Sequence, residues 1–162
     1  MKIFPAIDIK DKKCVRLVKG DFNNKTVYQI SPEEQAGKYK DHGFKNLHIV
    51  DLDGALTGET VNLDIIKDIV DKFSLNVEVG GGIRNLDSIQ KYIDTGVEKV
   101  ILGSAAIKDK SFLKKACEKF SNKIALGLDA KDGYLSVSGW KENSHKLTLE
   151  YLREINDYGV SR

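Results

Sequence analysis

Short apolar runs rich in β-branched residues alternate with amphipathic segments along the chain. The apolar runs, which are typical of strands, lie at residues 2–7, 46–50, 76–79, 99–102 and 123–128. The segments between and after them carry apolar residues every three or four positions, which predicts helices at residues 31–43, 62–73, 85–96, 112–120 and 148–158. Consecutive parallel strands need a helical crossover, so this order of elements predicts a parallel α/β sheet.

Specific residues mark the helix boundaries. Ser31 precedes Pro32 and two glutamates, which combines an N-cap residue, proline at the first helical position and an acid at the third. Gly43 follows the last turn of the same helix. Asn62 is expected to cap the next helix with its side chain.

Two α/β folds have this order of elements. A doubly wound open sheet expects a glycine-rich turn after its first strand, whereas here the first strand runs into Asp8 and the next glycine is Gly20. A (β/α)8 TIM barrel expects functional residues at the carboxyl ends of several strands, which is where this chain places them. We therefore expect the TIM barrel fold, in a single domain over residues 1–162.

The length of the chain limits how much of a barrel it can form. A complete (β/α)8 barrel takes roughly 250 residues, and the pattern supplies about five βα units. We expect an incomplete barrel whose second half begins near residue 123 and is cut off. Its open strand edges predict that the fragment self-associates and has little activity alone, whereas a form extended through the eighth strand is expected to be an active monomer.

Composition narrows the classes of function. The 162 residues include 26 basic and 24 acidic side chains spread along the chain, so no patch for nucleic acid or for a membrane is expected. The first residues lack the apolar core of a secretory signal, which favours a cytoplasmic protein. Cys14 and Cys117 are isolated, which disfavours a disulfide framework and a zinc site.

One pattern occurs twice, at the ends of two apolar runs. Its two copies are Ile7-Asp8-Ile9-Lys10-Asp11 and Leu128-Asp129-Ala130-Lys131-Asp132. Each is followed by a polar turn and a second extended stretch, at residues 13–18 and 134–137. A single aspartate at a strand end is usually a turn or capping residue. Two in matched contexts predict a duplicated βα array with Asp8 and Asp129 as an acid–base pair.

Two neighbouring loops could bind phosphate. Gly80, Gly81 and Gly82 follow a strand and precede a helix, where bare backbone N–H groups and the helix terminus would attract an anion. Gly103 and Ser104 follow the next strand in the same way. The alternative for the first loop is a turn that needs glycine for its positive φ angles.

Taken together, several segments resemble one family. In chain order these segments are Phe4-Pro5-Ala6-Ile7-Asp8-Ile9, Val15-Arg16-Leu17, Leu47-His48-Ile49-Val50-Asp51-Leu52-Asp53-Gly54-Ala55, Gly80-Gly81-Gly82-Ile83-Arg84, Gly103-Ser104-Ala105-Ala106, Leu128-Asp129-Ala130-Lys131-Asp132-Gly133 and Gly139-Trp140. They are similar to the phosphoribosylformimino-5-aminoimidazole carboxamide ribotide isomerases of histidine biosynthesis. The resemblance implies a (β/α)8 barrel of two similar halves. It also implies an Amadori-type isomerisation of an aminoaldose phosphate to an aminoketose phosphate, with no cofactor and no metal.

The resemblance assigns roles to individual residues. It implies that Asp8 is the base and Asp129 the acid, and that one phosphate of a small ribotide substrate binds at Gly82, Gly103 and Ser104. The residues that match substrate-contacting positions are Arg16, His48, Arg84 and Trp140. The alternatives are solvated arginines, a core tryptophan and a packed histidine.

Strand alternation bears on one of these assignments. His48 and Asp51 are three positions apart, so alternation places them on opposite faces of the sheet. The site hypothesis therefore keeps His48 and gives Asp51 little weight.

Two other functions stay open. The cyclase subunit of imidazole glycerol phosphate synthase has a similar barrel, but its pattern has lysine at the position of Arg16, histidine at that of Arg84 and Asn-Thr in place of Gly103-Ser104. Each difference favours the isomerase. A half barrel that binds a phosphosugar without catalysis, and dimerises to complete its sheet, is the remaining alternative.

Overall fold

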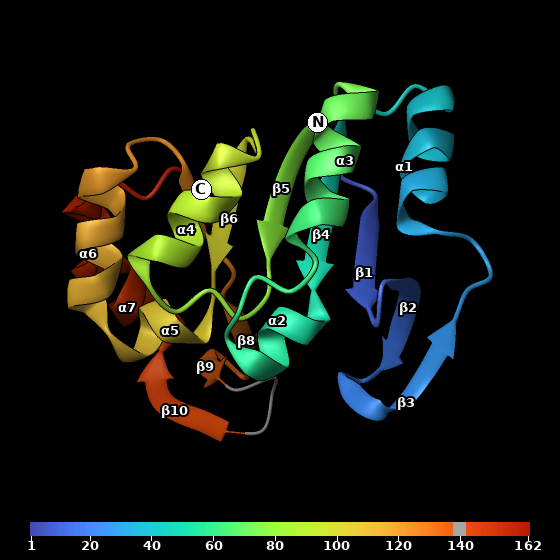
Figure 1. The fold of residues 1–162 in the computed structure, drawn as a ribbon. Helices are drawn as coiled ribbons and strands as arrows, with labels where there is room; N and C mark the ends of the chain where they lie inside the picture. The colour runs from blue at the N-terminus through green and yellow to red at the C-terminus, as the bar shows by residue number, and fades with distance from the viewer. Residues whose placement is uncertain (138–141) are drawn as a thin grey trace.

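The computed structural model describes residues 1–137 and 142–162, which form two sheets. The larger sheet has the strand order β3-β2-β1-β4-β5-β6-β7 (Figure 1). Its strands are β1 (Ala6–Lys10), β2 (Lys13–Val18), β3 (Asp21–Val27), β4 (Asn46–Asp51), β5 (Asn76–Gly80), β6 (Lys99–Leu102) and β7 (Ile124–Leu126). The strands β1, β4, β5, β6 and β7 are parallel, as expected. The sheet is extended by β2, which pairs antiparallel with β1, and by β3, which pairs antiparallel with β2.

Helices connect the parallel strands. They are α1 (Pro32–Asp41), α2 (Leu52–Thr57), α3 (Leu63–Phe73), α4 (Leu86–Asp94), α5 (Ser104–Lys108), α6 (Lys110–Lys119) and α7 (Thr148–Glu154), with the 3-10 helix η1 (Asn156–Tyr158) after α7. In Figure 1, α3 and α4 cross in front of the sheet, with the N-terminal hairpin on one side of the molecule and α6 on the other. The alternation of parallel strands with helices is that of a partial (β/α) barrel whose sheet remains open.

The first strand lies further along the chain than its apolar run predicts. Residues 2–7 were the predicted strand, but β1 begins at Ala6 and ends at Lys10. Its register explains the shift, since Ala6 pairs with His48 and Ile9 with Asp51, and the far end pairs with β2 through Lys10 and Lys13. Pairing with neighbours on both sides thus overrides the local preference of the first residues.

Other boundaries differ by a few residues. β7 ends at Leu126 rather than at residue 128, and the last helix ends at Glu154 with a 3-10 turn after it, instead of running to Tyr158. The helix α1 has the predicted capping box, with the Ser31 hydroxyl accepting from the Glu34 backbone N–H and the Glu34 carboxylate accepting from the Ser31 N–H. Asn62 stands at the N-cap position of α3, but its side chain makes no capping bond, so that prediction was wrong.

One row of side chains across the parallel strands builds the core. The strand registers align Ile7, Ile49, Val79, Val100 and Ile124, and each is buried. Burying an aliphatic side chain of this size contributes about 1.5 to 3 kcal/mol. This row faces the helices. On each strand, the residues directly before and after the member of this row face the opposite side of the sheet.

The chain after β7 first forms the second, smaller sheet. β8 (Asp129–Lys131), β9 (Tyr134–Val137) and β10 (Glu142–Leu147) make a three-stranded antiparallel sheet. The chain then returns through α7, and its last residues pair with β7, because Ser161 N–H donates to the Ile124 carbonyl at 2.9 Å and Leu126 N–H to that of Arg162 at 2.8 Å. Within the described ranges, none of the helices is both long and apolar enough to cross a membrane.

Candidate active site

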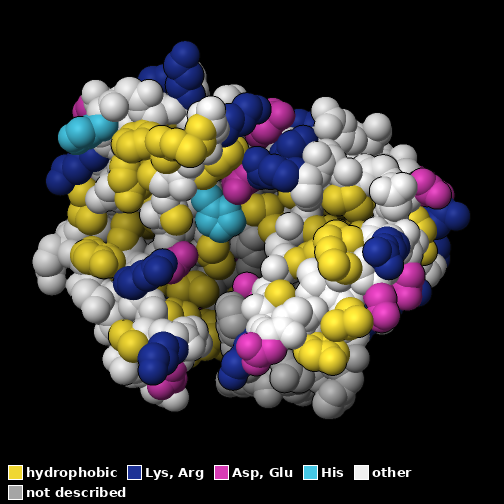
Figure 2. Space-filling model, turned by 180° about the vertical axis from the view of Figure 1, so that it is seen from behind, with side chains coloured by type: hydrophobic (Ala, Val, Ile, Leu, Met, Phe, Trp, Pro, Cys, Tyr) yellow, Lys and Arg dark blue, Asp and Glu magenta, His cyan; other side chains and the backbone are white. Residues whose placement is uncertain are grey.

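The carboxyl ends of the five parallel strands meet at one edge of the sheet, and Asp8 lies close to the end of β1 there. Asp8 is half-buried on the face opposite the helix-covered row, whereas its neighbours Ile7 and Ile9 point into the core. Figure 2 shows the molecule from the side opposite to the one in Figure 1; this face is hollowed in the middle and carries hydrophobic side chains and a histidine along the hollow. The geometry therefore places a carboxylate on a recessed face at the edge where barrel enzymes carry their active sites.

The environment of Asp8 changes its acidity. Burial raises the pKa of this carboxyl, and the positive charge of Arg16, together with that of His48 when its ring is protonated, only partly opposes the effect. The Arg16 guanidinium lies 3.8 Å from the Asp8 carboxylate and is itself largely exposed. A carboxyl with a raised pKa binds a proton more readily than an exposed aspartate does, which suits a group that exchanges protons.

A cavity of about 280 Å³ opens next to Asp8. Asp8 and Arg16 line it together with Tyr28, Gln35 and Tyr39, so it lies between the β1–β2 hairpin and α1. Of the residues expected to bind substrate that the structure describes, only Arg16 borders this cavity. Asp8 of β1 and Arg16 of β2 therefore border the cavity, whereas the predicted phosphate loops at residues 80–82 and 103–104 do not.

His48 lies on the same face as Asp8. It pairs with Ala6 in the register, and Ala6 and Asp8 are two positions apart on β1. Its ring Nδ1 lies 2.8 Å from the carboxylate of Glu78 on β5. The structure thus confirms that His48 and Asp51 occupy opposite faces of β4, since Asp51 is fully buried on the helix side.

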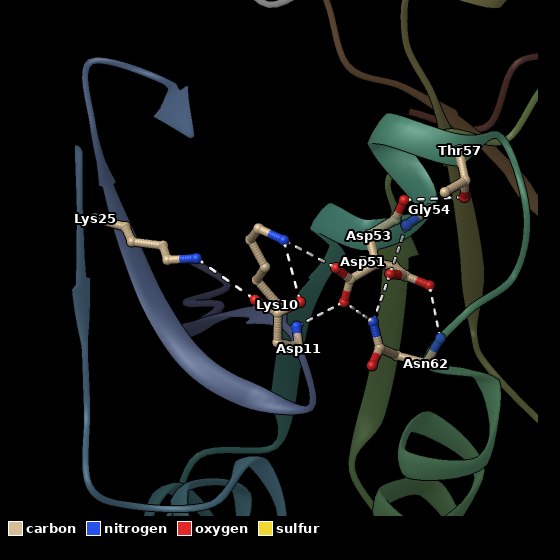
Figure 3. A network of polar contacts seen from close by, with 8 residues as sticks. All are labelled: Lys10, Asp11, Lys25, Asp51, Asp53, Gly54, Thr57 and Asn62. Carbon is tan, nitrogen blue, oxygen red and sulfur yellow. Dashed lines mark hydrogen bonds and ion pairs between the residues drawn. The ribbon is translucent and has the colours of Figure 1, made fainter. Parts of the chain in front are cut away.

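A buried network around Asp51 and Asp53 was not foreseen (Figure 3). Asp51 caps α2 by accepting from the Gly54 N–H at 2.9 Å, and it also accepts from the Asn62 backbone N–H, the Asn62 side-chain amide and the Tyr92 hydroxyl. The Asn62 amide donates to Asp53 as well, at 2.9 Å. Asn62 is therefore used to bridge two carboxylates, which explains why it does not cap α3.

This network extends to the turn that follows β1, at Asp11. Asp53 accepts from the Asp11 backbone N–H at 2.8 Å and from the Lys10 ammonium at 3.3 Å. Burial alone would raise the pKa of Asp53, but the hydrogen bonds from Asn62, Asp11 and Lys10 outweigh it and lower the pKa. The local signal for this network in the sequence is the Asp51-x-Asp53 spacing directly after an apolar strand, and that spacing does not by itself indicate the partners.

The glycine loop after β5 is tightly packed. Gly81 and Gly82 have φ angles of 114° and 69°, so the alternative of a turn that requires glycine is correct for both. A Cβ on Gly82 would lie 1.7 Å from the Gly54 carbonyl oxygen. The N-terminus of α4 beyond the loop is already capped, because the Asn85 side chain accepts from the Ser88 N–H at 2.7 Å.

Arg84 follows this loop and is attached to the protein itself. Its guanidinium donates to the Ala55 carbonyl of α2 at 3.0 Å. The side chain is also packed against Gly58, where a Cβ would come within 2.9 Å of the guanidinium. Arg84 is therefore held over α2, although the residue remains exposed to solvent.

The loop after β6 is different. Gly103 precedes α5, whose first residue is Ser104, and the Gly103 carbonyl accepts from the Ala106 N–H at 3.0 Å. Among the described residues, a Cβ on Gly103 would meet only the Gly127 carbonyl oxygen at 3.7 Å, an ordinary contact. The described residues around this loop therefore leave space for a ligand beside Gly103.

The second aspartate lies at the other end of the sheet. Asp129 begins β8 and is exposed, and three strands, β4, β5 and β6, separate β1 from β7, which precedes it. In the part of the chain that the structure describes, no hydrogen bond or ion pair joins its side chain to that of Asp8. Trp140 lies outside the described residues.

A parallel sheet with connecting helices, and a half-buried carboxylate on its open face at the carboxyl edge, define a protein of the α/β-barrel class with a candidate site at that edge. The family model described as histidine biosynthesis protein matches residues 2–162, so the chain belongs to this family.

Curated relatives agree with this assignment. A protein of Pelagibacter ubique is 83% identical over all 162 residues, which cover 68% of its own length. Proteins of Oceanobacillus iheyensis and Clostridium kluyveri are 47% and 49% identical over 160 residues, or 67% of each. All three are named 1-(5-phosphoribosyl)-5-((5-phosphoribosylamino)methylideneamino) imidazole-4-carboxamide isomerase. The chain thus spans about two thirds of the length of these relatives.

Proposed function

We propose that this chain carries the acid–base site of an isomerase that converts an aminoaldose ribosyl phosphate to the aminoketose in histidine biosynthesis. The observation that carries the proposal is the 83% identity, over the whole chain, to a protein named as such an isomerase. The half-buried Asp8 at the carboxyl end of β1 supports it, because the reaction needs a carboxylate that exchanges protons.

The rearrangement needs only proton transfers. A proton on the ring oxygen opens the furanose and leaves an iminium at C1, and loss of the C2 proton then gives an enolamine. The enol tautomerises to the ketone as C1 gains a proton, so the hydrogen lost at C2 is balanced at C1. One base and one acid therefore suffice, and neither a cofactor nor a metal takes part.

Asp8 is the base in this proposal, and Asp129 is the acid. The raised pKa of Asp8 brings its proton affinity closer to the working pH, where a general base is most effective. The carboxyl ends of β1 and β7 lie at the same edge of the sheet, and β7 leads within three residues to Asp129. A substrate held between the two strands would have one carboxyl on each side.

The phosphate is proposed to bind at Gly82, Gly103 and Ser104. The loops after β5 and β6 are neighbours, because their strands pair in parallel. The open surroundings of Gly103 favour it as the main contact, whereas the packing of Gly82 already gives a structural reason for glycine there. Substrate contacts are proposed for Arg16, His48, Arg84 and Trp140, of which Arg16 and His48 lie close enough to Asp8 to affect its charge.

A chimera tests the proposal without depending on how much of a barrel this chain forms alone. The region of the Pelagibacter ubique isomerase that matches is replaced by this chain, and conversion of the aminoaldose substrate is followed by absorbance. We expect activity comparable to that of the Pelagibacter ubique protein, and a loss of about 100-fold or more in kcat for Asp8→Asn in the chimera. A folded but inactive chimera, or an Asp8→Asn variant with full kcat, contradicts the proposal.

A further inference from the structure

A row of polar side chains crosses the open face of the sheet. The strand registers pair Ala6 with His48, His48 with Glu78, and Glu78 with Lys99. Paired residues of parallel strands point to the same face, so His48 and Glu78 stand side by side on the face that carries Asp8. No part of the proposed mechanism uses Glu78.

Glu78 is almost fully buried and binds a partner with each oxygen. Its Oε1 lies 2.8 Å from His48 Nδ1, and its Oε2 accepts from the Arg162 guanidinium. Arg162 is fixed in turn, since its guanidinium lies 4.8 Å from the centre of the Phe4 ring and its carbonyl accepts from Leu126 N–H. The Glu78 carboxylate is therefore held in place from two sides, by His48 and by Arg162.

The pairing determines which nitrogen of His48 carries hydrogen. A carboxylate that pairs with an arginine stays ionised and only accepts hydrogen bonds, so His48 Nδ1 must donate. Burial lowers the pKa of His48, Asp8 on β1 opposes this effect and Arg162 adds to it, while the Glu78 carboxylate faces the ring at Nδ1. In the neutral ring, which the lowered pKa favours near pH 7, the single hydrogen is on Nδ1, next to that carboxylate.

The other nitrogen is then the one available to a ligand. The side chain of His48 is 31% exposed, while that of Glu78 is 9% exposed, so the imidazole edge away from Glu78 is the edge that solvent reaches. In the neutral ring this edge carries the bare lone pair of Nε2. An acceptor nitrogen close to Asp8 suits a donor group such as a sugar hydroxyl.

We propose that Glu78 is a positioning residue, which holds His48 in the Nδ1–H tautomer so that Nε2 accepts a hydrogen bond from a hydroxyl of the sugar phosphate. The identity of the ligand rests on the proposed function, whereas the tautomer rests on the geometry alone. The pairing with Arg162 keeps the carboxylate in place, and His48 keeps its orientation when the site is empty.

Nitrogen NMR of the uniformly labelled chain tests the tautomer directly. Two-bond proton–nitrogen correlations at pH 8 distinguish Nδ1–H from Nε2–H for each histidine. We expect Nδ1–H for His48, and in Glu78→Leu a shift to a population in which Nε2–H predominates. His42 is an internal control, because its Nδ1 bonds to the Lys38 carbonyl at 2.6 Å and is remote from the substitution.

Two further variants keep the test decisive if Glu78→Leu does not fold. Glu78→Gln retains an acceptor oxygen but loses the charge, so His48 should remain Nδ1–H and titrate about 0.5 to 1 pH unit lower. The exposed Glu98→Gln should leave the titration of His48 unchanged. An Nε2–H tautomer in the unmodified chain, or an unchanged Nδ1–H population in folded Glu78→Leu, overturns the inference.

Kinetics of the chimera then separate positioning from mere packing. His48→Ala and Glu78→Gln should each lower kcat/KM, by about 10-fold or more for His48→Ala, and the double variant should lose no more than the larger single loss. Independent losses that multiply would show that Glu78 does not act through His48. An inactive chimera together with the expected tautomer would refute the proposed function and leave the positioning geometry standing.

Discussion

The loop after β5 is packed against its neighbours, whereas the loop after β6 leaves room for a side chain. In the first, Gly81 and Gly82 touch the backbone of Asp51 and Gly54 so closely that no Cβ fits. In the second, a Cβ on Gly103 would have one neighbour within residues 1–137 and 142–162, at van der Waals distance. Both loops follow neighbouring parallel strands and precede helices, so their difference does not come from the fold class.

The difference comes from what lies beside each loop. The loop after β5 rests on α2, which is itself fixed by the hydrogen bonds of Asp51 and Asn62. Glycine there permits close backbone approach, while at Gly103 no such contact demands it. A glycine at a strand end can therefore serve packing or access, and its surroundings decide which.

The largest expected effect is that of Gly82→Ala. The new methyl would overlap the Gly54 carbonyl oxygen and would need a φ of 69°, so the backbone of α2 or of the loop must move. We expect a loss of about 3 to 5 kcal/mol in the free energy of unfolding, measured by urea denaturation with far-UV circular dichroism. A loss below about 1 kcal/mol would mean that the loop is not fixed by α2.

Asp51→Asn tests the support beneath the same loop. The carboxylate accepts four hydrogen bonds while fully buried, and an amide in its place would turn its NH2 group toward one or more of these donors. We expect a loss of about 2 to 4 kcal/mol in the free energy of unfolding. The exposed Asp64→Asn serves as the matched control and should change it by less than about 0.5 kcal/mol.

The sequence predicted the strands and helices around both loops, because their apolar periodicity follows from which face is buried. It also identified Asp8, whose pKa burial raises, and the antiparallel stretches of residues 13–18 and 134–137, which are β2 and β9. The short helices α2 and α5 were missed, since five or six residues are too few to show a helical period.

The network of Asp51, Asp53 and Asn62 could not be derived in the same way. Asn62 lies 9 residues from Asp53 and 11 from Asp51, and the two carboxylates also bind Tyr92 and the turn at Asp11, which belong to other parts of the chain. The local pattern predicted Asn62 as a helix cap. That its side-chain amide donates to two carboxylates, Asp51 and Asp53, is seen only in the folded structure. The partnership of Glu78 with Arg162 is likewise a product of tertiary structure, since 84 positions separate them.

A smaller effect is expected for Asp53, which belongs to the network beneath the loop after β5, and it appears in the pH dependence of stability. The pKa of Asp53 in the folded chain lies below its ordinary value of 3.8, so the ionised form stabilises the fold above that value. This contribution is lost as the pH falls below about 4 through the folded-state pKa. Unfolding free energies at about pH 5.5 and pH 3 should therefore differ less in Asp53→Asn than in the unmodified chain, by about 1 kcal/mol or less.

A control isolates this effect from general acid destabilisation. Asp41 is an exposed carboxylate at the end of α1, and Asp41→Asn should retain the full pH dependence of the unmodified chain. Equal pH dependence in Asp53→Asn and Asp41→Asn would show that the hydrogen bonds from Asn62, Asp11 and Lys10 do not stabilise the charged form.

The smallest expected effect on stability is that of Gly103→Ala, and it bears most directly on function. The methyl would have space, so the free energy of unfolding should change by less than about 1 kcal/mol, against several for Gly82→Ala. If the substrate phosphate lies against this loop, the same methyl would obstruct it, and in the chimera KM should rise about 10-fold or more while kcat changes less. Inorganic phosphate should then inhibit the chimera less strongly when it carries Gly103→Ala. An unchanged KM in a stable Gly103→Ala chimera would remove Gly103 from the proposed phosphate site and would mean that both glycine loops are structural.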